Sequence, residues 1–163
     1  MSESTEVARV GLISDTHGLL RPEVFDVFAG VDRILHAGDV GDPDILTELG
    51  AIGPVSAVWG NVDFDLRSSL SEIVELQIGG VAVGVLHGHQ LGSPTPARLA
   101  ERLPKAGMVV FGHTHQPLVE RIGTVLATNP GSAGPRRFNL PVTVGIATFE
   151  RGQVTVDLVP LDR

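Results

Sequence analysis

Two short segments of this chain carry side chains at a spacing that suits metal binding. Asp15 and His17 are separated by one residue, and so are His113 and His115. In an extended segment, residues i and i+2 point to the same side of the backbone, so each pair could reach one ion or two adjacent ions. Imidazole and carboxylate ligands without sulfur suit first-row ions such as Mn, Fe, Co, Ni or Zn. The two pairs therefore predict a metal site.

Further candidate ligands share one setting, a glycine-containing turn directly after an apolar segment. They are Asp39, Asn61 and His87. Glycine removes side-chain bulk and permits unusual backbone angles, so neighbouring ligands could crowd together. Each of these turns is common on its own, and the combination favours a metal site over ordinary turn chemistry. The full set is too large for one ion and suits two ions sharing a carboxylate: Asp15, His17, Asp39, Asn61, His87, His113 and His115.

The segments before these turns have the pattern of an α/β fold. Short apolar segments at 7–13, 33–36 and 55–59 predict strands, and helices are expected at about 22–28 and 43–49. Strand, polar loop and helix repeat, which indicates parallel strands. Because ligands bind at the carboxyl ends of strands in open α/β sheets, the polar loops should converge on one site.

The rest of the chain is richer in strands. Gly79-Gly80 predicts a hairpin between strands at 72–78 and 81–86, and a helix at 96–103 precedes a strand at 108–111. Four more strands are expected at 118–121, 124–127, 142–149 and 154–159. This pattern predicts an α/β fold of two sheets packed face to face with helices outside, as one domain over residues 1–163.

Composition limits the functional classes. Of 163 residues, 42% are hydrophobic and 19% charged, which is usual for one globular domain. A net charge of -7 gives no long-range attraction to nucleic acid, so no stable nucleic-acid complex is expected. The absence of cysteine excludes disulfides and thiolate chemistry. Residues 1–6 show no leader and no apolar run suits a membrane span, so a cytoplasmic protein that binds no membrane is expected.

Five more residues are candidates for supporting roles. His89 is expected near the site, and His36 could be either a site partner or a packed core histidine. Asp63 could orient a ligand or lie exposed in its turn. Arg136 and Arg137 could bind a phosphate oxygen, although adjacent arginines are usually solvated.

The polar motifs, taken in this order, resemble those of the calcineurin-like metallophosphoesterases. They are Asp15-Thr16-His17, Gly38-Asp39, Gly60-Asn61-Val62-Asp63, His87-Gly88-His89 and Gly112-His113-Thr114-His115. Chain length and Asn129-Pro130-Gly131-Ser132 are similar to the small YfcE-like phosphodiesterase branch. The resemblance implies a four-layer α/β/β/α sandwich of two mixed sheets, with the metals at one edge of the sheets.

The resemblance also implies how the ligands divide. Asp15, His17, Asp39 and His115 would hold one ion, and Asp39, Asn61, His87 and His113 the other, with Asp39 bridging. Asp39, Asn61 and His87 are the expected catalytic residues, and Mn is the expected ion, ahead of Fe, Ni, Co or Zn. A metal-bridging hydroxide would attack the phosphorus of a small phosphoester. Two divalent ions outweigh two ligand carboxylates, so the site could attract phosphate although the protein is acidic.

One position departs from the family pattern. Many members carry histidine after the Gly-Asn pair, where it assists the leaving group, and this chain has Val62. The departure favours a phosphodiesterase and leaves a phosphomonoesterase as the next candidate. A non-catalytic scaffold like the retromer component Vps29 and a mononuclear metal hydrolase acting on amides are the competing functions from different classes. Exposed apolar strand edges are compatible with a homodimer or homotetramer.

Overall fold

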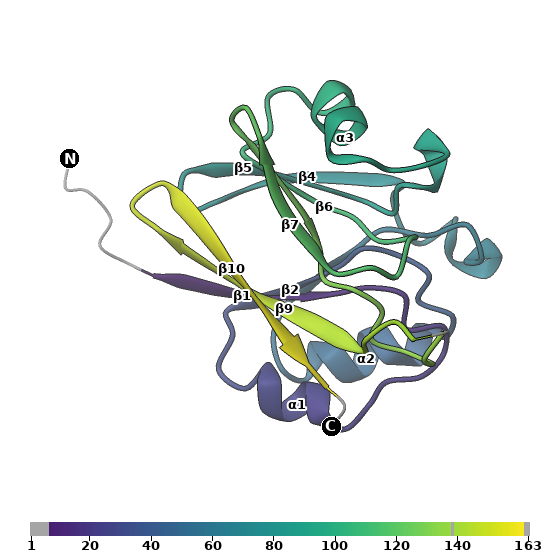
Figure 1. Ribbon diagram of the computed structural model, residues 1–163. Coiled ribbons are helices and arrows are strands. Elements are labelled where there is room, and N and C mark those ends of the chain that lie inside the picture. Colours follow the sequence, from purple (N-terminus) through teal and green to yellow (C-terminus); the bar gives the residue numbers. More distant parts are fainter. Residues whose placement is uncertain (1–6, 138, 162–163) are drawn as a thin grey trace.

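The computed structural model describes residues 7–137 and 139–161. Residues 1–6, on which the expectation of no leader rests, lie outside this description. The described strands form two five-stranded sheets (Figure 1). The first sheet contains β1 (Ala8–Ile13), β2 (Arg33–His36), β3 (Val55–Ala57), β9 (Thr143–Glu150) and β10 (Gln153–Pro160). The second contains β4 (Ile73–Ile78), β5 (Val81–Leu86), β6 (Met108–Val110), β7 (Leu118–Ile122) and β8 (Val125–Asn129).

Both sheets are mixed. The first has the order β10-β9-β1-β2-β3, in which β1, β2 and β3 are parallel and β9 is antiparallel to β1 and β10. The second has the order β4-β5-β6-β8-β7, in which β5, β6 and β8 are parallel. The hairpins β4–β5 and β7–β8 supply its antiparallel pairs. Each sheet therefore contributes three parallel strands whose carboxyl ends carry loops.

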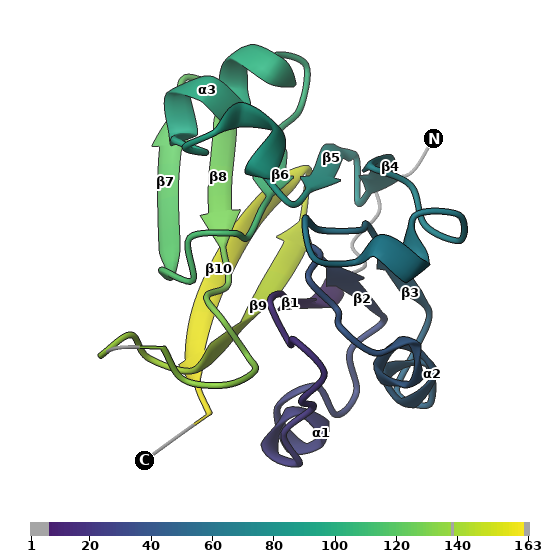
Figure 2. The ribbon, with the colours of Figure 1, turned by 90° about the vertical axis from the view of Figure 1, so that its right-hand side faces the viewer.

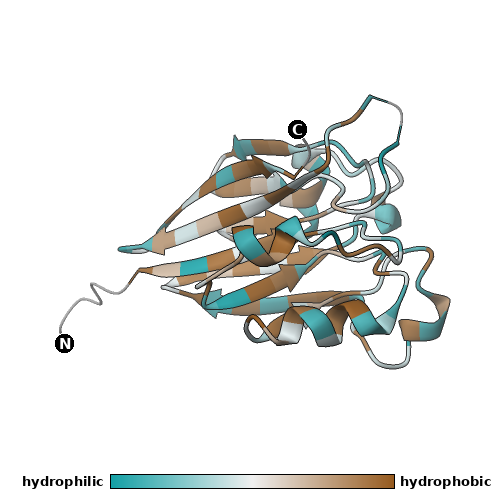
Figure 3. Cartoon of the chain, turned by 90° about the horizontal axis from the view of Figure 1, so that it is seen from below, coloured by the Kyte–Doolittle hydropathy of each residue, from teal (hydrophilic) through white to brown (hydrophobic). Residues whose placement is uncertain are grey.

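Helices cover the outer face of each sheet, which confirms the predicted four layers. Helices α1 (Glu23–Val27) and α2 (Pro43–Gly50) pack on the first sheet, and α3 (Pro96–Arg102) packs on the second (Figure 2). Each of these helix–sheet contacts forms an apolar cluster, and a further apolar cluster joins the inner faces of the two sheets. Hydrophobic and hydrophilic residues alternate along several strands and helices, as expected for elements buried on one side (Figure 3).

Local sequence explains where the helices begin. Asp42 accepts a hydrogen bond from the backbone N–H of Asp44 at the start of α2, and Thr95 does the same for Arg98 at the start of α3. Both helices have proline in their first turn, where its missing N–H costs no intrahelical bond. None of the described helices is long and apolar enough to cross a membrane.

The predicted strand at 55–59 ends early. The ladder of β3 stops at Ala57, and Val58 forms only an isolated bridge with Ser71. Two 3-10 helices, η1 (Phe64–Leu66) and η2 (His89–Leu91), follow metal-motif turns and have no counterpart in the predicted elements. The remaining predicted elements are present, with ends that differ by at most two residues.

Candidate metal centre

The predicted ligands lie in loops that follow five of the six parallel strands. Asp15 and His17 follow β1, Asp39 follows β2, Asn61 follows β3, His87 follows β5, and His113 and His115 follow β6. Hydrogen bonds between loops of different sheets show that these strand ends meet. The backbone N–H of His113 donates to Asp15 Oδ2 at 3.2 Å, for example.

The Asp15 carboxylate is surrounded by three histidines. Its Oδ1 lies 3.3 Å from Nε2 of His115, 3.6 Å from Nε2 of His17 and 3.8 Å from Nε2 of His87. Its other oxygen accepts hydrogen bonds from the Ser14 hydroxyl at 2.7 Å and from the His113 backbone. The side chain is fully buried, so one oxygen is fixed by protein donors and the other faces the histidines.

The Asp39 carboxylate is divided in the same way. Its Oδ2 lies 3.1 Å from Nε2 of His87 and 3.6 Å from Nε2 of His17, while Oδ1 accepts the Val62 N–H at 3.1 Å. The side chains form two overlapping triads, Asp15-His17-His115 and Asp15-Asp39-His87, whose ligand atoms lie within 4.8 Å of one another. Each carboxylate therefore has one oxygen close to at least two histidine rings.

Buried polar atoms at this position have the properties of metal ligands. Within the described residues, Asp15 Oδ1, Asn61 Oδ1 and His87 Nε2 are buried and have no hydrogen-bond partner. Leaving such atoms unpaired away from water is costly, and bound metal ions would supply the missing partners. The ring of His113 lies 5.3 Å from that of His87, beside the same group. The donor set therefore fits divalent ions.

The cluster shifts the pKa values of its own groups. Burial raises the pKa of Asp15, but the nearby rings of His115, His17 and His87 outweigh this effect, and the net pKa lies well below its usual range. Burial likewise opposes the ionisation of Asp39, yet contact with His87 lowers its pKa overall. For His87, burial lowers the pKa and the two carboxylates more than reverse this. Both carboxylates are therefore held in the charged form that binds a cation.

The ligands occupy an unusual backbone conformation. Six described non-glycine residues have a positive φ, and five of them are predicted ligands: Asp15, His17, Asp39, His113 and His115. Such backbone angles are uncommon for residues with a side chain and persist only where the surroundings enforce them. The loops thus turn sharply at the ligands, which differs from the extended geometry assumed from the i, i+2 spacing.

Glycine is needed for the close approach of these loops, as predicted. A Cβ at Gly60 would collide with the carboxylate and backbone nitrogen of Asp39. A Cβ at Gly112 would collide with the Ser14 hydroxyl and the Asp15 carboxylate. Each glycine therefore lets one loop pass directly over a ligand of another.

Asp63 is buried rather than exposed, and it contacts backbone rather than a ligand side chain. Its carboxylate accepts the N–H groups of Val40 at 3.0 Å, Gly41 at 3.0 Å and Gly60 at 2.9 Å. Asp63 therefore ties the loop after β2 to the loop after β3. The interpretation as an exposed turn residue is wrong, because only 3% of its surface is accessible.

Two further polar side chains fix the geometry of the loops. His87 Nδ1 lies 2.8 Å from the carbonyl oxygen of Ala37, so this nitrogen carries a proton and Nε2 is the ring nitrogen that can bind an ion. Asn129, at the end of β8, donates to the Gly112 carbonyl at 3.2 Å and to the Thr114 hydroxyl at 3.0 Å. The sixth parallel strand thus holds the histidine loop in place. In the sequence, Asn129 stands out only as part of a family motif.

The remaining candidates lie in different surroundings. The half-buried ring of His89 lies 5.4 Å from that of His87 and 5.5 Å from that of Trp59. Arg67, which no sequence pattern singles out, stacks between Trp59 and Phe64 at 4.7 and 4.8 Å from the two ring centres. Val62, in the same loop, is 44% exposed.

The two arginines proposed for phosphate lie in the loop before β9. Arg136 is exposed and donates to the Leu140 carbonyl at 3.2 Å, and Arg137 is also exposed. Their role in binding phosphate stays a prediction.

Comparison with known proteins defines the class. The family model of the calcineurin-like phosphoesterase superfamily domain matches residues 9–152. A probable metallophosphoesterase of Methanothermobacter thermautotrophicus is 38% identical over 141 residues, which cover 81% of each chain. A protein of Methanocaldococcus jannaschii named as a phosphodiesterase is 24% identical, with 88% of this chain and 94% of that protein covered.

Solved structures extend the comparison to two kinds of protein. A predicted phosphoesterase from Streptococcus pneumoniae has a TM-score of 0.76 and 26% identity, with 98% of this chain and 93% of that chain covered. Vps29 from Entamoeba histolytica, solved in complex with Zn²⁺, has a TM-score of 0.68 and 25% identity, with 94% and 99% covered. The chain belongs to the calcineurin-like phosphoesterase superfamily. This membership supports phosphoester hydrolysis with divalent metal ions as the class of chemistry.

Proposed function

We propose that this chain is a phosphodiesterase that uses two divalent metal ions, with Mn as the preferred ion. One observation carries the proposal: the ligand atoms form two overlapping triads, Asp15-His17-His115 and Asp15-Asp39-His87. A mononuclear site would need only one of these triads and would leave the other as an unexplained cluster of buried polar atoms.

The proposed division of ligands follows the positions of the carboxylates. Asp39 would contribute to both sites, since its Oδ2 lies 3.6 Å from Nε2 of His17, assigned to the first site, and 3.1 Å from Nε2 of His87, assigned to the second. His115 and Asp15 complete the first site. His113 and Asn61 complete the second, where the Asn61 oxygen adds a ligand without adding negative charge that would repel a phosphate.

Each catalytic residue has its own proposed task. When bound, two such ions would lower the pKa of a water molecule and polarise the phosphoryl oxygens. Asp39 is kept ionised and aimed by the Val62 N–H. His87 is held by Ala37 in the tautomer whose Nε2 can act as a ligand. Asn61 has a buried oxygen without a hydrogen-bond partner, which is available as a ligand.

The preference for diesters is supported at position 62. Val62 is exposed beside the centre and has no proton to give to a leaving group, which disfavours esters with poor leaving groups. The relative named as a phosphodiesterase agrees with this preference. A phosphomonoesterase on the same site is the alternative.

A Vps29-like scaffold is the second candidate function, favoured by the structural likeness to Vps29. Metal binding alone does not separate the two functions, because that Vps29 was itself solved with Zn²⁺. Turnover does separate them.

We further propose that residues 1–163 form a single cytoplasmic domain, that the protein is a homodimer or homotetramer, and that its substrate is a small phosphoester. Loops of both halves contribute to one centre, which supports the single domain.

The decisive experiment combines metal counting with turnover. Mn-loaded protein should contain close to two ions per chain and hydrolyse bis(4-nitrophenyl) phosphate faster than 4-nitrophenyl phosphate. Asp39→Asn keeps an oxygen for the Val62 N–H but removes the charge, so it should lose at least one ion and about 100-fold or more in kcat. Asp157→Asn, an exposed carboxylate on β10, is the matched control and should change neither.

Different results would support the competing functions. One tightly bound ion per chain would support the mononuclear hydrolase. Faster monoester hydrolysis would overturn the diester preference. Two bound ions with no turnover on any phosphoester would favour the scaffold.

A further inference from the structure

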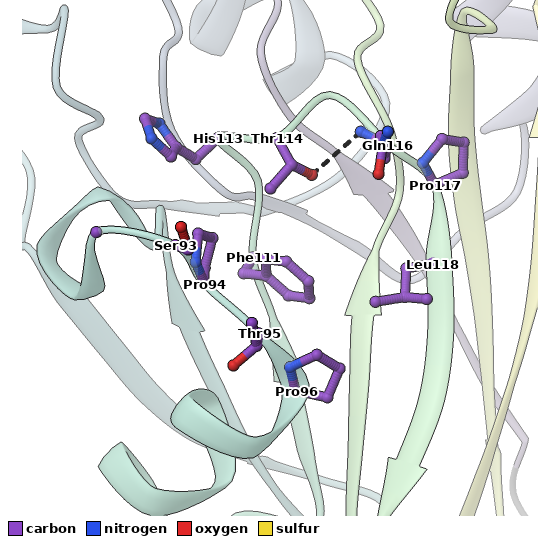
Figure 4. A pocket seen from close by; sticks show the side chains of 11 residues that line it. Ser93, Pro94, Thr95, Pro96, Phe111, His113, Thr114, Gln116, Pro117 and Leu118 are labelled. Atoms are coloured by element: carbon purple, nitrogen blue, oxygen red, sulfur yellow. Dashed lines mark hydrogen bonds between the residues drawn. The ribbon is translucent and has the colours of Figure 1, made fainter.

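A pocket of about 470 Å³ lies directly beside the metal centre. It is bounded by the segment before α3, the loop between β6 and β7, and the first residue of β7 (Figure 4). Phe111 lies in the middle of the pocket wall, between Pro94 on one side and Leu118 on the other, with Pro96 below it in this view (Figure 4). Its volume lies within the range of small-molecule binding sites.

The walls of this pocket are almost uncharged and are connected by hydrogen bonds. His113 is the one lining residue with an ionisable side chain, and the others are apolar residues, glycine, hydroxyl residues and one glutamine. The Thr114 hydroxyl accepts hydrogen bonds from the Gln116 N–H at 3.2 Å and from Asn129, which fixes the loop on one side. The Arg98 guanidinium donates to the Ser93 carbonyl at 3.2 Å and steadies the other side. The pocket therefore suits a neutral, largely apolar group such as an aromatic ring.

His113 is the wall shared by the pocket and the metal centre. Its ring lies 5.3 Å from the ring of His87 on one side, and it lines the pocket on the other. Only the His113 side chain is thus common to the pocket and to the ligand group, so the two are neighbours. The pocket lies on the face of the second sheet that α3 covers. It is therefore next to the strand ends that carry the ligands, not directly above them.

We propose that this pocket binds the organic substituent that stays on phosphorus, and that it selects a neutral ring over a small alkyl group. This inference rests on the proposed phosphodiesterase function. In-line displacement puts the leaving oxygen opposite the nucleophile, so the substituent that stays points sideways, past a ligand such as His113. The pocket then explains how a diester is preferred, because a monoester has nothing to place there.

Two diesters with the same leaving group test the proposal. Bis(4-nitrophenyl) phosphate keeps an aryl group on phosphorus, and methyl 4-nitrophenyl phosphate keeps only a methyl group. The ratio of their kcat/KM values should be about tenfold or more in favour of the aryl ester, which is the size of discrimination expected from an apolar pocket.

Filling the pocket should abolish that ratio. Leu118→Trp should fill it from β7, and Ser93→Trp should fill it from an exposed loop position. Both should bring the ratio to within about twofold of unity while leaving kcat/KM for the methyl ester nearly unchanged. Val119→Trp, at the next residue of β7 and outside the pocket, is the matched control. A ratio near unity in the unmodified protein, or one that neither variant changes, overturns the proposal.

A binding measurement separates this proposal from the proposed function. Calorimetry on Mn-loaded protein should show tighter binding of phenylphosphonate than of methylphosphonate, and Leu118→Trp should remove the difference. If no ester is hydrolysed but this difference is found, the proposed function fails and the pocket stands. If diesters are hydrolysed and the two phosphonates bind equally well in every variant, the pocket fails and the function stands.

Discussion

The backbone N–H of Gly38 donates to Nδ1 of His36 at 3.1 Å. This contact assigns the proton of the imidazole to Nε2, which lies 3.0 Å from the Thr16 hydroxyl. That hydroxyl in turn donates to the Val40 carbonyl at 2.8 Å. A fully buried histidine thus connects the loops after β1 and β2, and it does so in its neutral form.

The first prediction concerns acid stability. Burial lowers the pKa of His36 to about 4, although the Asp15 carboxylate opposes the change. Between pH 6.5 and about 4 the unfolded chain binds a proton that the folded chain does not, so the free energy of unfolding falls as the pH is lowered. The loss from this residue should total about 3 kcal/mol.

Urea unfolding with a chelator present, at several pH values, measures this effect. His36→Gln has no titrating group, so the stability difference between the two proteins should shrink as the pH approaches 4.5. Parallel stability curves over this range would show that His36 does not titrate as described.

A second prediction concerns Asp63. Asp63→Asn replaces one carboxylate oxygen with an amide nitrogen, which cannot accept a hydrogen bond. At least one of the three backbone N–H groups therefore loses its partner. An unpaired buried donor costs about 1–3 kcal/mol, so thermal or urea unfolding should show a loss of about 2–4 kcal/mol. The Mn affinity should fall with it, because the Asp39 and Asn61 loops lose their connection. Asp65→Asn, at an exposed position two residues on, should change stability by less than about 0.5 kcal/mol.

The third prediction concerns Val62→His, which adds a proton donor at the exposed position beside the centre. It should raise kcat for phosphoesters with alkyl leaving groups by about 100-fold, while activated aryl esters change little. The dependence of rate on leaving-group pKa should therefore become shallower. Phe64→His, at another exposed position of the same loop, controls for a histidine placed nearby. An equal change for both ester types would argue against leaving-group assistance.

A fourth prediction compares two glycines. Gly60→Ala forces a methyl group against Asp39 and should lower the Mn affinity at least about tenfold, with a loss of about 1–3 kcal/mol in stability. Gly50→Ala, at the end of α2 where a Cβ meets nothing within 4 Å, should leave stability unchanged or raise it by up to about 1 kcal/mol. Titration of apo-protein with Mn and thermal unfolding measure both variants. Equal behaviour would show that the close approach at Gly60 is unimportant.

The strands and the grouping of their loops could be predicted from local patterns. Short β-branched segments that end in polar turns indicate the ends of strands. The carboxylate and imidazole groups of Asp15, His113 and their neighbours indicate that these ends bind metal ions. The order of strands within a sheet could not be predicted in the same way. The pairing of β8 with β6, and of β9 with β1, depends on packing between segments far apart in the chain.

Roles that depend on burial also escaped prediction. Asp63 has the sequence of an ordinary turn residue, and only the fold around it shows that its carboxylate is enclosed by three amides. The stacking of Arg67 between Trp59 and Phe64 depends on the turn made by η1. The pocket beside His113 is formed by segments about 20 residues apart, and no local pattern marks it.

The arrangement of the hairpins has a practical consequence for engineering. The parallel strands end at the metal centre, so the turns at Gly79-Gly80, Gly123-Thr124 and Arg151-Gly152, which join antiparallel neighbours, lie at the opposite end of the sandwich. A fluorophore, an affinity tag or a surface anchor could be inserted there, a full strand length from the chemistry. The proposed catalytic site and the attachment points would thus lie at opposite ends of the sandwich.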